Sequence, residues 1–105
     1  MMTTQTKTSL KQLRAELAAI AVKSTRPVGT KLTLSSLGDE YGHAAFTLKA
    51  DGLCKLVRVA LTAWCAAYGL AIQSMEIRGG RYNWHYFYVL VPREHVKNPD
   101  KHAFV

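Results

Sequence analysis

The sequence predicts an α+β fold with the order αββαββ, in which a mainly antiparallel four-stranded sheet carries two helices on one face. Two segments repeat apolar residues at helical spacing, four segments alternate or read as strands, and turn residues join those strands in pairs. With 105 residues, the chain is long enough for one hydrophobic core. We expect a flexible N-terminus (1–8), a single domain (9–92) and a C-terminal tail (93–105) with room for a short helical turn.

The first helix is predicted over about residues 10–24. Ser9 and Gln12 have the spacing of a capping box, in which the two side chains satisfy each other's free backbone N–H groups. Apolar residues then recur at helical spacing, at Leu13, Leu17 and Ile20. The stretch "STRPVG", residues 24–29, ends the helix because proline cannot continue it.

The first hairpin is predicted from two alternating stretches, "KLTLSSL" (31–37) and "HAAFTLKA" (43–50), with the turn "GDEYG" (38–42) between them. Alternate residues of a strand share one face. The even-numbered residues therefore form an apolar face, and the odd-numbered ones form a polar, basic face. The apolar set is Leu32, Leu34, Ala44, Phe46 and Leu48.

The second helix follows Asp51, which we expect to be its N-cap, and ends at Gly69. Its predicted inward residues run from Leu53 to Tyr68 and include Leu56. Its polar stripe is narrow, and Val59 adds apolar surface beside it. Such a helix is either central to the fold or partly covered by a second copy of the protein.

The second hairpin is predicted from "AIQSMEIR" (71–78) and "RYNWHYFYVLV" (81–91), joined by a two-residue turn at Gly79-Gly80, where glycine tolerates positive φ. This register pairs Met75 with Trp84 and Ala71 with Tyr88, so the row of even-numbered aromatics faces the core. A three-residue loop would turn the same row to solvent, and the sequence leaves that alternative open. The row consists of Tyr82, Trp84, Tyr86 and Tyr88.

The two αββ units resemble each other, since "LKQLRAELAAIA" aligns with "LCKLVRVALTAW" and "GDEYGHAAFTLKA" aligns with "GGRYNWHYFYVLV". Duplication of one unit and chance similarity both account for this match.

The chain is strongly basic, with a formal net charge of +7. This charge favours nucleic acid, an acidic protein surface or an anionic membrane as a partner. Neither a secretory signal nor a membrane span is evident, because the N-terminus lacks an apolar core and Lys55 and Arg58 interrupt the apolar segment 53–70. We therefore expect a cytoplasmic protein that does not bind a membrane.

The sequence predicts neither a metal nor a cofactor. Cys54 and Cys65 lie on one predicted helix, roughly 16 Å apart along its axis, which is too far for a disulfide. The four histidines are scattered and show no metal-ligand spacing. No nucleophile elbow, phosphate loop or zinc-protease motif occurs, and no second titratable group is evident to orient His85. The sequence therefore favours a protein that is not an enzyme, and an enzyme that uses His85 to carry a proton is the third and least supported hypothesis.

Our first functional hypothesis is a small basic module that binds nucleic acid or a nucleoprotein through the outer sheet face and the first helix. Cations would contact phosphates, and Phe87 would offer a stacking surface. The predicted contact residues are Lys11, Arg14, Lys31, Lys49, Arg78, Arg81, Asn83, His85 and Phe87.

The alternative hypothesis is a protein-binding adaptor or inhibitor of the kind that mobile elements encode, acting as a homodimer or by docking on an acidic protein. Its predicted interface residues are Val59, Ile72, Phe87 and Val89.

Overall fold

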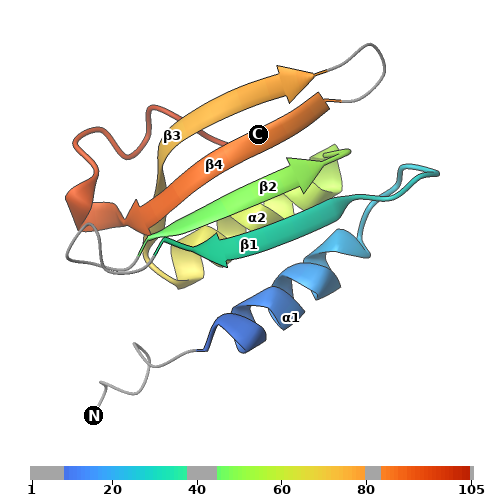
Figure 1. The fold of residues 1–105 in the computed structure, drawn as a ribbon, viewed down its shortest axis with the longest axis horizontal. Helices are drawn as coiled ribbons and strands as arrows, with labels where there is room; N and C mark the ends of the chain where they lie inside the picture. The colour runs from blue at the N-terminus through green and yellow to red at the C-terminus, as the bar shows by residue number, and fades with distance from the viewer. Residues whose placement is uncertain (1–8, 38–44, 80–83, 105) are drawn as a thin grey trace.

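The computed structural model, which describes residues 9–37, 45–79 and 84–104, confirms the predicted α+β fold. The described elements are α1 (Leu10–Ala21), β1 (Lys31–Ser36), β2 (Phe46–Asp51), α2 (Lys55–Ala67), β3 (Leu70–Gly79), β4 (Trp84–Pro92) and the 3-10 turn η2 (Arg93–His95). The strands form one sheet in the order β1-β2-β4-β3, and every neighbouring pair is antiparallel (Figure 1). No helix in the described part of the chain is long and apolar enough to cross a membrane.

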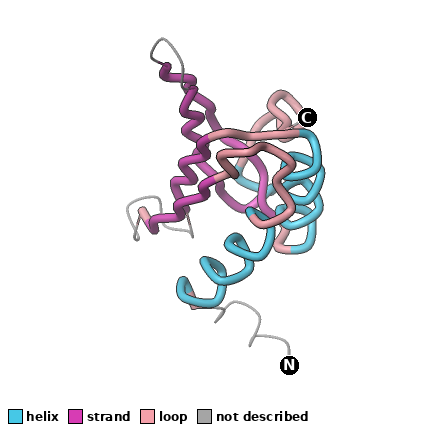
Figure 2. Tube along the Cα trace, turned by 90° about the vertical axis from the view of Figure 1, so that its right-hand side faces the viewer, coloured by secondary structure: helices cyan, strands magenta, loops and turns pink. Residues whose placement is uncertain are grey.

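Both helices lie on the same side of the sheet, and among the described residues no helix covers the opposite face (Figure 2). Side chains from α1, α2 and the inward face of the strands form one core. The first hairpin follows the predicted alternation, because Leu34, Leu48 and Ala50 are all buried. The predicted turn, residues 38–42, lies outside the described residues.

Helix α1 begins where the sequence predicted, because the backbone N–H of Gln12 donates to Ser9 Oγ at 3.1 Å. The second half of the capping box does not form. The Gln12 side chain donates instead to Glu16 Oε2 at 3.1 Å. The helix ends at Ala21, earlier than the predicted residue 24.

The predicted start of α2 is wrong. Asp51 is the last residue of β2, and Cys54, with extended backbone angles, is the N-cap of a helix that begins at Lys55. This start places Val57, Leu61 and Trp64 toward the core, so that Leu56 points outward and is 54% exposed. The end of the helix, just before Gly69, is as predicted.

The second hairpin has a different register from the one predicted, because four residues, 80–83, separate its strands. Gly79 pairs with Trp84 and Met75 pairs with Tyr88, so the prediction that Met75 pairs with Trp84 is wrong. The observed register differs from the predicted one by an even number of residues, since Met75 pairs with Tyr88 and not with Trp84. Tyr86 and Tyr88 therefore still face the helices, as predicted. Tyr82 lies outside the described residues.

An irregularity in β3, between Ile72 and Ser74, changes which residues face inward. It pairs Ile72 with Leu90, and Ile72 becomes a core residue that is 4% exposed. The prediction that Ile72 lies on an exposed interface is therefore wrong, because a regular strand was assumed.

The β3-β4 hairpin extends beyond the helices (Figure 2). As a result, the aromatic row changes environment along β4. Tyr88 is 1% exposed and packs against Phe104, with ring centroids 4.7 Å apart, whereas Trp84 is 59% exposed. The row faces the predicted side, but only its inner end lies in the core.

The C-terminal segment contains the predicted short helical turn, η2, and it also packs against the domain. Phe104 is buried, and its carbonyl oxygen accepts a hydrogen bond of 2.6 Å from the Arg58 guanidinium. The packed chain therefore continues past residue 92 rather than ending in a free tail.

Candidate functional site

The outer sheet face, which carries no helix, presents two rows of mainly polar side chains that cross all four strands. The first row joins neighbouring residues from β1 to β3, and the second lies beside it in the same order. The first row is Lys31, Asp51, His85 and Arg78, and the second is Thr33, Lys49, Phe87 and Glu76. Five predicted contact residues, namely Lys31, Lys49, Arg78, His85 and Phe87, therefore share this face.

On the β3 side of this face, Arg78 already has a partner and is therefore less available to bind phosphates than the sequence indicated. Arg78 is bound to Glu76 through two hydrogen bonds of 3.0 and 3.1 Å. These bonds raise the pKa of Arg78 and lower that of Glu76. The Phe87 ring already makes cation–π contacts with two side chains, because Arg78 Cζ lies 4.8 Å from its centroid and Lys49 Nζ lies 5.8 Å from it.

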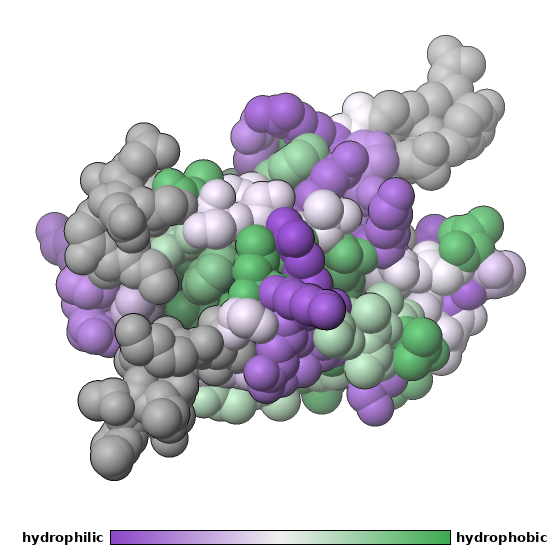
Figure 3. All heavy atoms as spheres, turned by 60° about the horizontal axis from the view of Figure 1, so that its bottom comes forward, coloured by the Kyte–Doolittle hydropathy of each residue, from purple (hydrophilic) through white to green (hydrophobic). Residues whose placement is uncertain are grey.

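The predicted helix residues lie elsewhere. Lys11 and Arg14 belong to α1, in the layer on the opposite side of the sheet from Phe87, and Arg14 Nε donates to the Leu34 carbonyl at 2.9 Å. On the side where α1 lies, hydrophilic and hydrophobic surface are intermingled (Figure 3). Arg81 and Asn83 lie outside the described residues. The predicted residues therefore do not form one continuous surface.

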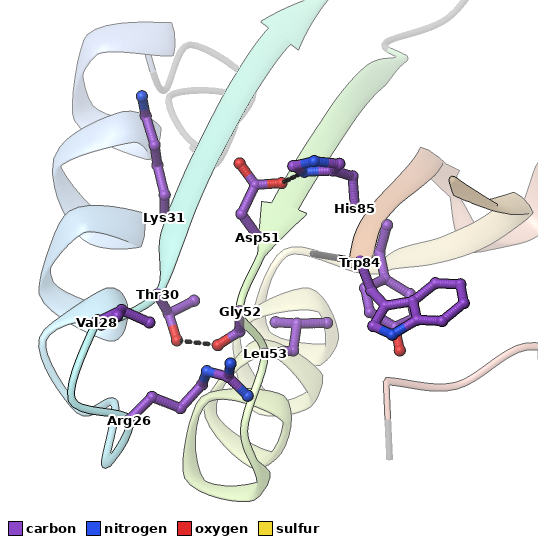
Figure 4. Close-up of a pocket in the computed structure, with 11 residues that line it drawn as sticks. Arg26, Val28, Thr30, Lys31, Asp51, Gly52, Leu53, Trp84 and His85 are labelled. Atoms are coloured by element: carbon purple, nitrogen blue, oxygen red, sulfur yellow. Dashed lines mark hydrogen bonds and ion pairs between the residues drawn. The ribbon is translucent and has the colours of Figure 1, made fainter. Parts of the chain in front are cut away.

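Most of the first row lines an open cavity of about 400 Å³, located where β2 ends and β4 begins (Figure 4). Two cations, Arg26 and Lys31, line it from the first half of the chain, and the aromatic residues Trp84 and Tyr86 line it from the second. The sequence analysis did not identify Arg26 or Trp84 as site residues. Arg26 lies outside a regular element, and Trp84 was assigned to the core.

The glycine at position 52 allows two loops to meet at the wall of the cavity. Its φ is 71°, in the left-handed region that favours glycine. A Cβ at this position would lie 2.8 Å from the Gly29 carbonyl oxygen, so the loop after β2 can approach the loop before β1 only because residue 52 is glycine. Thr30 stabilises the contact between these loops, since its hydroxyl donates to the Gly52 carbonyl at 2.6 Å.

Trp84 has a fixed place at the cavity despite its exposure. Its ring lies over the backbone of Gly79, its partner on β3, where an added Cβ would come within 2.3 Å of Trp84 Cε3. Gly79 has no positive φ, so its role differs from the predicted one in a tight turn. It makes room for the indole ring, which is consequently held and accessible at the same time.

His85 and Asp51 form a pair at the edge of the cavity. They are neighbours on β4 and β2, and His85 Nδ1 contacts Asp51 Oδ1 (Figure 4). Both side chains are partly exposed. This pair was not predicted, because a carboxylate at position 51 is also typical of a helix cap. The prediction that no titratable group orients His85 is wrong.

Cys54 lies close by in sequence, at the N-terminus of α2. The nearby backbone N–H groups of Val57 and Thr25 lower the pKa of its thiol to about 6. The sulfur does not cap the helix, and its hydrogen bond is to Ser24 Oγ at 3.9 Å. Cys65, in contrast, is buried in the core, and burial raises its pKa to about 12. Both cysteines are free.

No group of His, Cys, Asp and Glu residues that could hold a metal ion occurs within residues 9–37, 45–79 and 84–104. Comparisons with protein-family models, curated proteins and solved structures find no match for this chain. Any functional assignment therefore depends on the geometry of the site alone.

The residues predicted for a protein interface are divided between two sides of the molecule. Phe87 and Val89 are half-buried on the outer sheet face. Val59, which is 51% exposed, lies on the outward side of α2 together with Leu56. Exposed apolar surface is therefore more extensive on α2, at Leu56 and Val59, than at Phe87 and Val89 on the sheet.

Proposed function

We propose that this protein binds single-stranded nucleic acid at the cavity where β2 ends and β4 begins. The observation that carries the proposal is the exposed Trp84 ring, held over Gly79 and opening into a cavity that Arg26 and Lys31 also line. Any of the bases can stack on an indole ring, because every base has a flat aromatic face, and nearby cations can contact the adjacent phosphates.

The charge of the chain supports this proposal. Its net charge is +7, and Asp51, the one carboxylate lining the cavity among the described residues, is paired with His85. From the cavity, a strand can continue along the outer sheet face past Lys49. We further propose a cytoplasmic location, with which two free cysteines are consistent.

Fluorescence anisotropy with labelled 12-nucleotide probes of mixed sequence tests the proposal, using single-stranded RNA, single-stranded DNA and duplex DNA over a range of KCl concentrations. We expect the single strands to bind more tightly than the duplex and the affinity to fall steeply with salt. Trp84→Ala should weaken binding about 5- to 150-fold, the equivalent of 1–3 kcal/mol for one stacked base.

The matched control for Trp84→Ala is Ile77→Ala, which also removes an exposed apolar side chain from the same hairpin. Lys31→Ala should reduce the slope of log K against log salt by about 0.7, the contribution of one phosphate contact on a single strand. Lys97→Ala, on the C-terminal segment, should leave this slope unchanged. Absent or salt-insensitive binding by the wild type would refute the proposal.

A second candidate function is docking of an acidic partner protein on α2. Leu56 and Val59 are each about half exposed on the outward side of this helix. The helix contains no acidic residue, and the exposed cation Lys55 lies beside the apolar pair. Since a second copy would bring two chains of charge +7 together, an acidic amphipathic segment fits this surface better than a homodimer does.

Calorimetric titration with a synthetic acidic amphipathic helical peptide tests this candidate, and Leu56→Glu combined with Val59→Glu should abolish binding. Ala19→Glu, at an exposed position of α1, is the control. Sedimentation velocity should show a monomer. A dimer that the double variant dissociates would replace this candidate with the homodimer.

A further inference from the structure

The His85 and Asp51 pair has a geometry that nucleic-acid binding alone does not require. Asp51 contacts His85 through Nδ1, which leaves Nε2 as the ring nitrogen available to a ligand. A carboxylate in this position holds the Nδ1 proton and orients the ring, so that neutral imidazole presents an unprotonated Nε2. This is the arrangement of a general base with its orienting group.

The residues around the pair determine which nucleophile such a base can activate. The one aliphatic hydroxyl among the described residues that line the cavity belongs to Thr30, and it already donates to the Gly52 carbonyl at 2.6 Å. Neither cysteine lines the cavity. The nucleophile is therefore best supplied by the ligand itself, and the ribose 2′-hydroxyl of RNA lies next to the phosphate that it can attack.

We propose that this site cleaves single-stranded RNA, with His85 as the base and Asp51 as its positioning residue. This inference rests on the proposed nucleic-acid binding and adds a reaction and a substrate class to it. His85 Nε2 takes the proton of the 2′-hydroxyl, the 2′-oxygen forms a bond to phosphorus, and the bond from phosphorus to the 5′-oxygen breaks. The 5′-oxygen takes a proton from water, and the imidazolium returns its proton to solvent. The products are a 2′,3′-cyclic phosphate and a 5′-hydroxyl.

The cations of the cavity have a place in this reaction. Negative charge accumulates on the non-bridging phosphate oxygens as the 2′-oxygen attacks. Lys31 faces Asp51 across β1 and β2, and Arg26 lies on the cavity wall beside Gly52 (Figure 4). The same two side chains that contact phosphates in the bound state can therefore stabilise the transition state.

The test compares three 12-nucleotide probes of one sequence: RNA, its fully 2′-O-methylated form, and DNA. We expect cleavage of RNA alone, with fragments that end in a cyclic phosphate, and binding of all three probes. His85→Ala should reduce the cleavage rate of bound RNA at least 100-fold, measured with protein in excess of its Kd so that a change in affinity does not enter the rate. His85→Gln provides a second variant of similar size, and the binding measurement shows that both variants are folded.

The positioning role of Asp51 has its own readout. Asp51→Asn should lower kcat about 10- to 1,000-fold with little change in KM, because the residue acts through His85 and not on the bound RNA. A rise in KM with unchanged kcat would assign Asp51 to binding and contradict the positioning role.

The outcomes separate this inference from the proposed function. Binding of all probes without cleavage of RNA would overturn the inference and leave the binding proposal intact. Cleavage of DNA would show that water, not the 2′-hydroxyl, is the nucleophile, and would overturn it too. Cleavage that survives in both His85 variants would assign the activity to another source. Failure of every probe to bind would refute the proposed function.

Discussion

The two αββ units of this protein have the same element order but use it differently. In both helices the buried residues have the same spacing: Leu13, Leu17 and Ile20 in α1, and Val57, Leu61 and Trp64 in α2. The first hairpin stays over the helices, whereas the second extends beyond them. The described strands of the first unit thus stay beside the helices, while the second unit leaves an aromatic end exposed.

This comparison corrects the alignment of the two units. The sequence match placed Leu13 opposite Leu56, but the buried positions place it opposite Val57, one residue further along. The two units share the spacing of the buried positions in their helices more closely than the identity of their residues. The cavity lies where the units meet, with Arg26 and Lys31 from the first and Trp84 and His85 from the second.

The largest expected effect concerns which side of α2 belongs to the core. Leu61→Ala should lower the free energy of unfolding by about 2–5 kcal/mol, because Leu61 is fully buried and the substitution leaves a cavity. The control is Leu56→Ala, the same substitution on the same helix at a half-exposed position, which should cost less than about 1 kcal/mol. Urea denaturation measures both, and equal costs would contradict the orientation of α2.

The second expected effect concerns the contact between the two helices. Glu16 of α1 accepts hydrogen bonds from Trp64 Nε1 of α2 at 3.0 Å and from the hydroxyl of Tyr68, the C-cap of α2, at 2.7 Å. The Tyr68 and Gln12 hydrogen bonds, followed by that of Trp64, lower the pKa of Glu16. The bond to Glu16 raises the pKa of Tyr68 to about 12.

Glu16→Gln should therefore destabilise the protein by about 1–3 kcal/mol at neutral pH, since it weakens charge-assisted hydrogen bonds. A lowered native pKa stabilises the fold above the ordinary carboxyl value of 4.5, and this stabilisation is lost as pH falls through the native pKa. The difference between wild type and variant should consequently shrink in acid.

Denaturation at a series of pH values measures this effect. The ultraviolet titration of Tyr68 should also move toward the ordinary value of 10 in the variant. Glu94→Gln, at an exposed position, is the control. If the difference in free energy of unfolding between wild type and variant stays constant from pH 7 to acid, the charge of Glu16 does not contribute to stability.

The alternation of apolar residues was enough to predict the fold, while the helix-facing side of the aromatic row also depended on the assumed two-residue turn. Hydrophobic periodicity determines which residues share a face, and the even-numbered shift of the second hairpin preserved that relation. The bulge near Ile72 and the length of the loop after Gly79 depend on tertiary packing, which periodicity does not contain. The exposure of Trp84 was missed for a related reason, because the lengths of strands do not reveal where the helices stop covering them.

The candidate site was only partly predictable. The sequence indicated Lys31 and His85, because odd-numbered residues of the strands had to face outward. It did not indicate Asp51 as the partner of His85, because a carboxylate before a helical pattern is typical of an N-cap. The pairing of β2 with β4, two strands distant in sequence, brings the two residues together, and no local pattern encodes it.

The smallest expected effect on the fold concerns Cys54, which also lies where the two units meet. Its sulfur lies near backbone N–H groups of Val57 in the second unit and Thr25 in the first, and these groups lower its pKa to about 6. Because the thiolate is the reactive form, alkylation of the native protein by iodoacetamide should reach half its maximal rate near pH 6.

Cys65 provides the internal control for this measurement. Burial raises its pKa to about 12, so it should react only after unfolding. Mass spectrometry should find one modified cysteine in the native wild type, none in Cys54→Ser, and two in the unfolded wild type. A half-maximal rate near pH 9 would mean that the Thr25 and Val57 groups do not reach the sulfur in solution. The two units would then meet less closely at the start of α2 than at the contact of Glu16 with Trp64 and Tyr68.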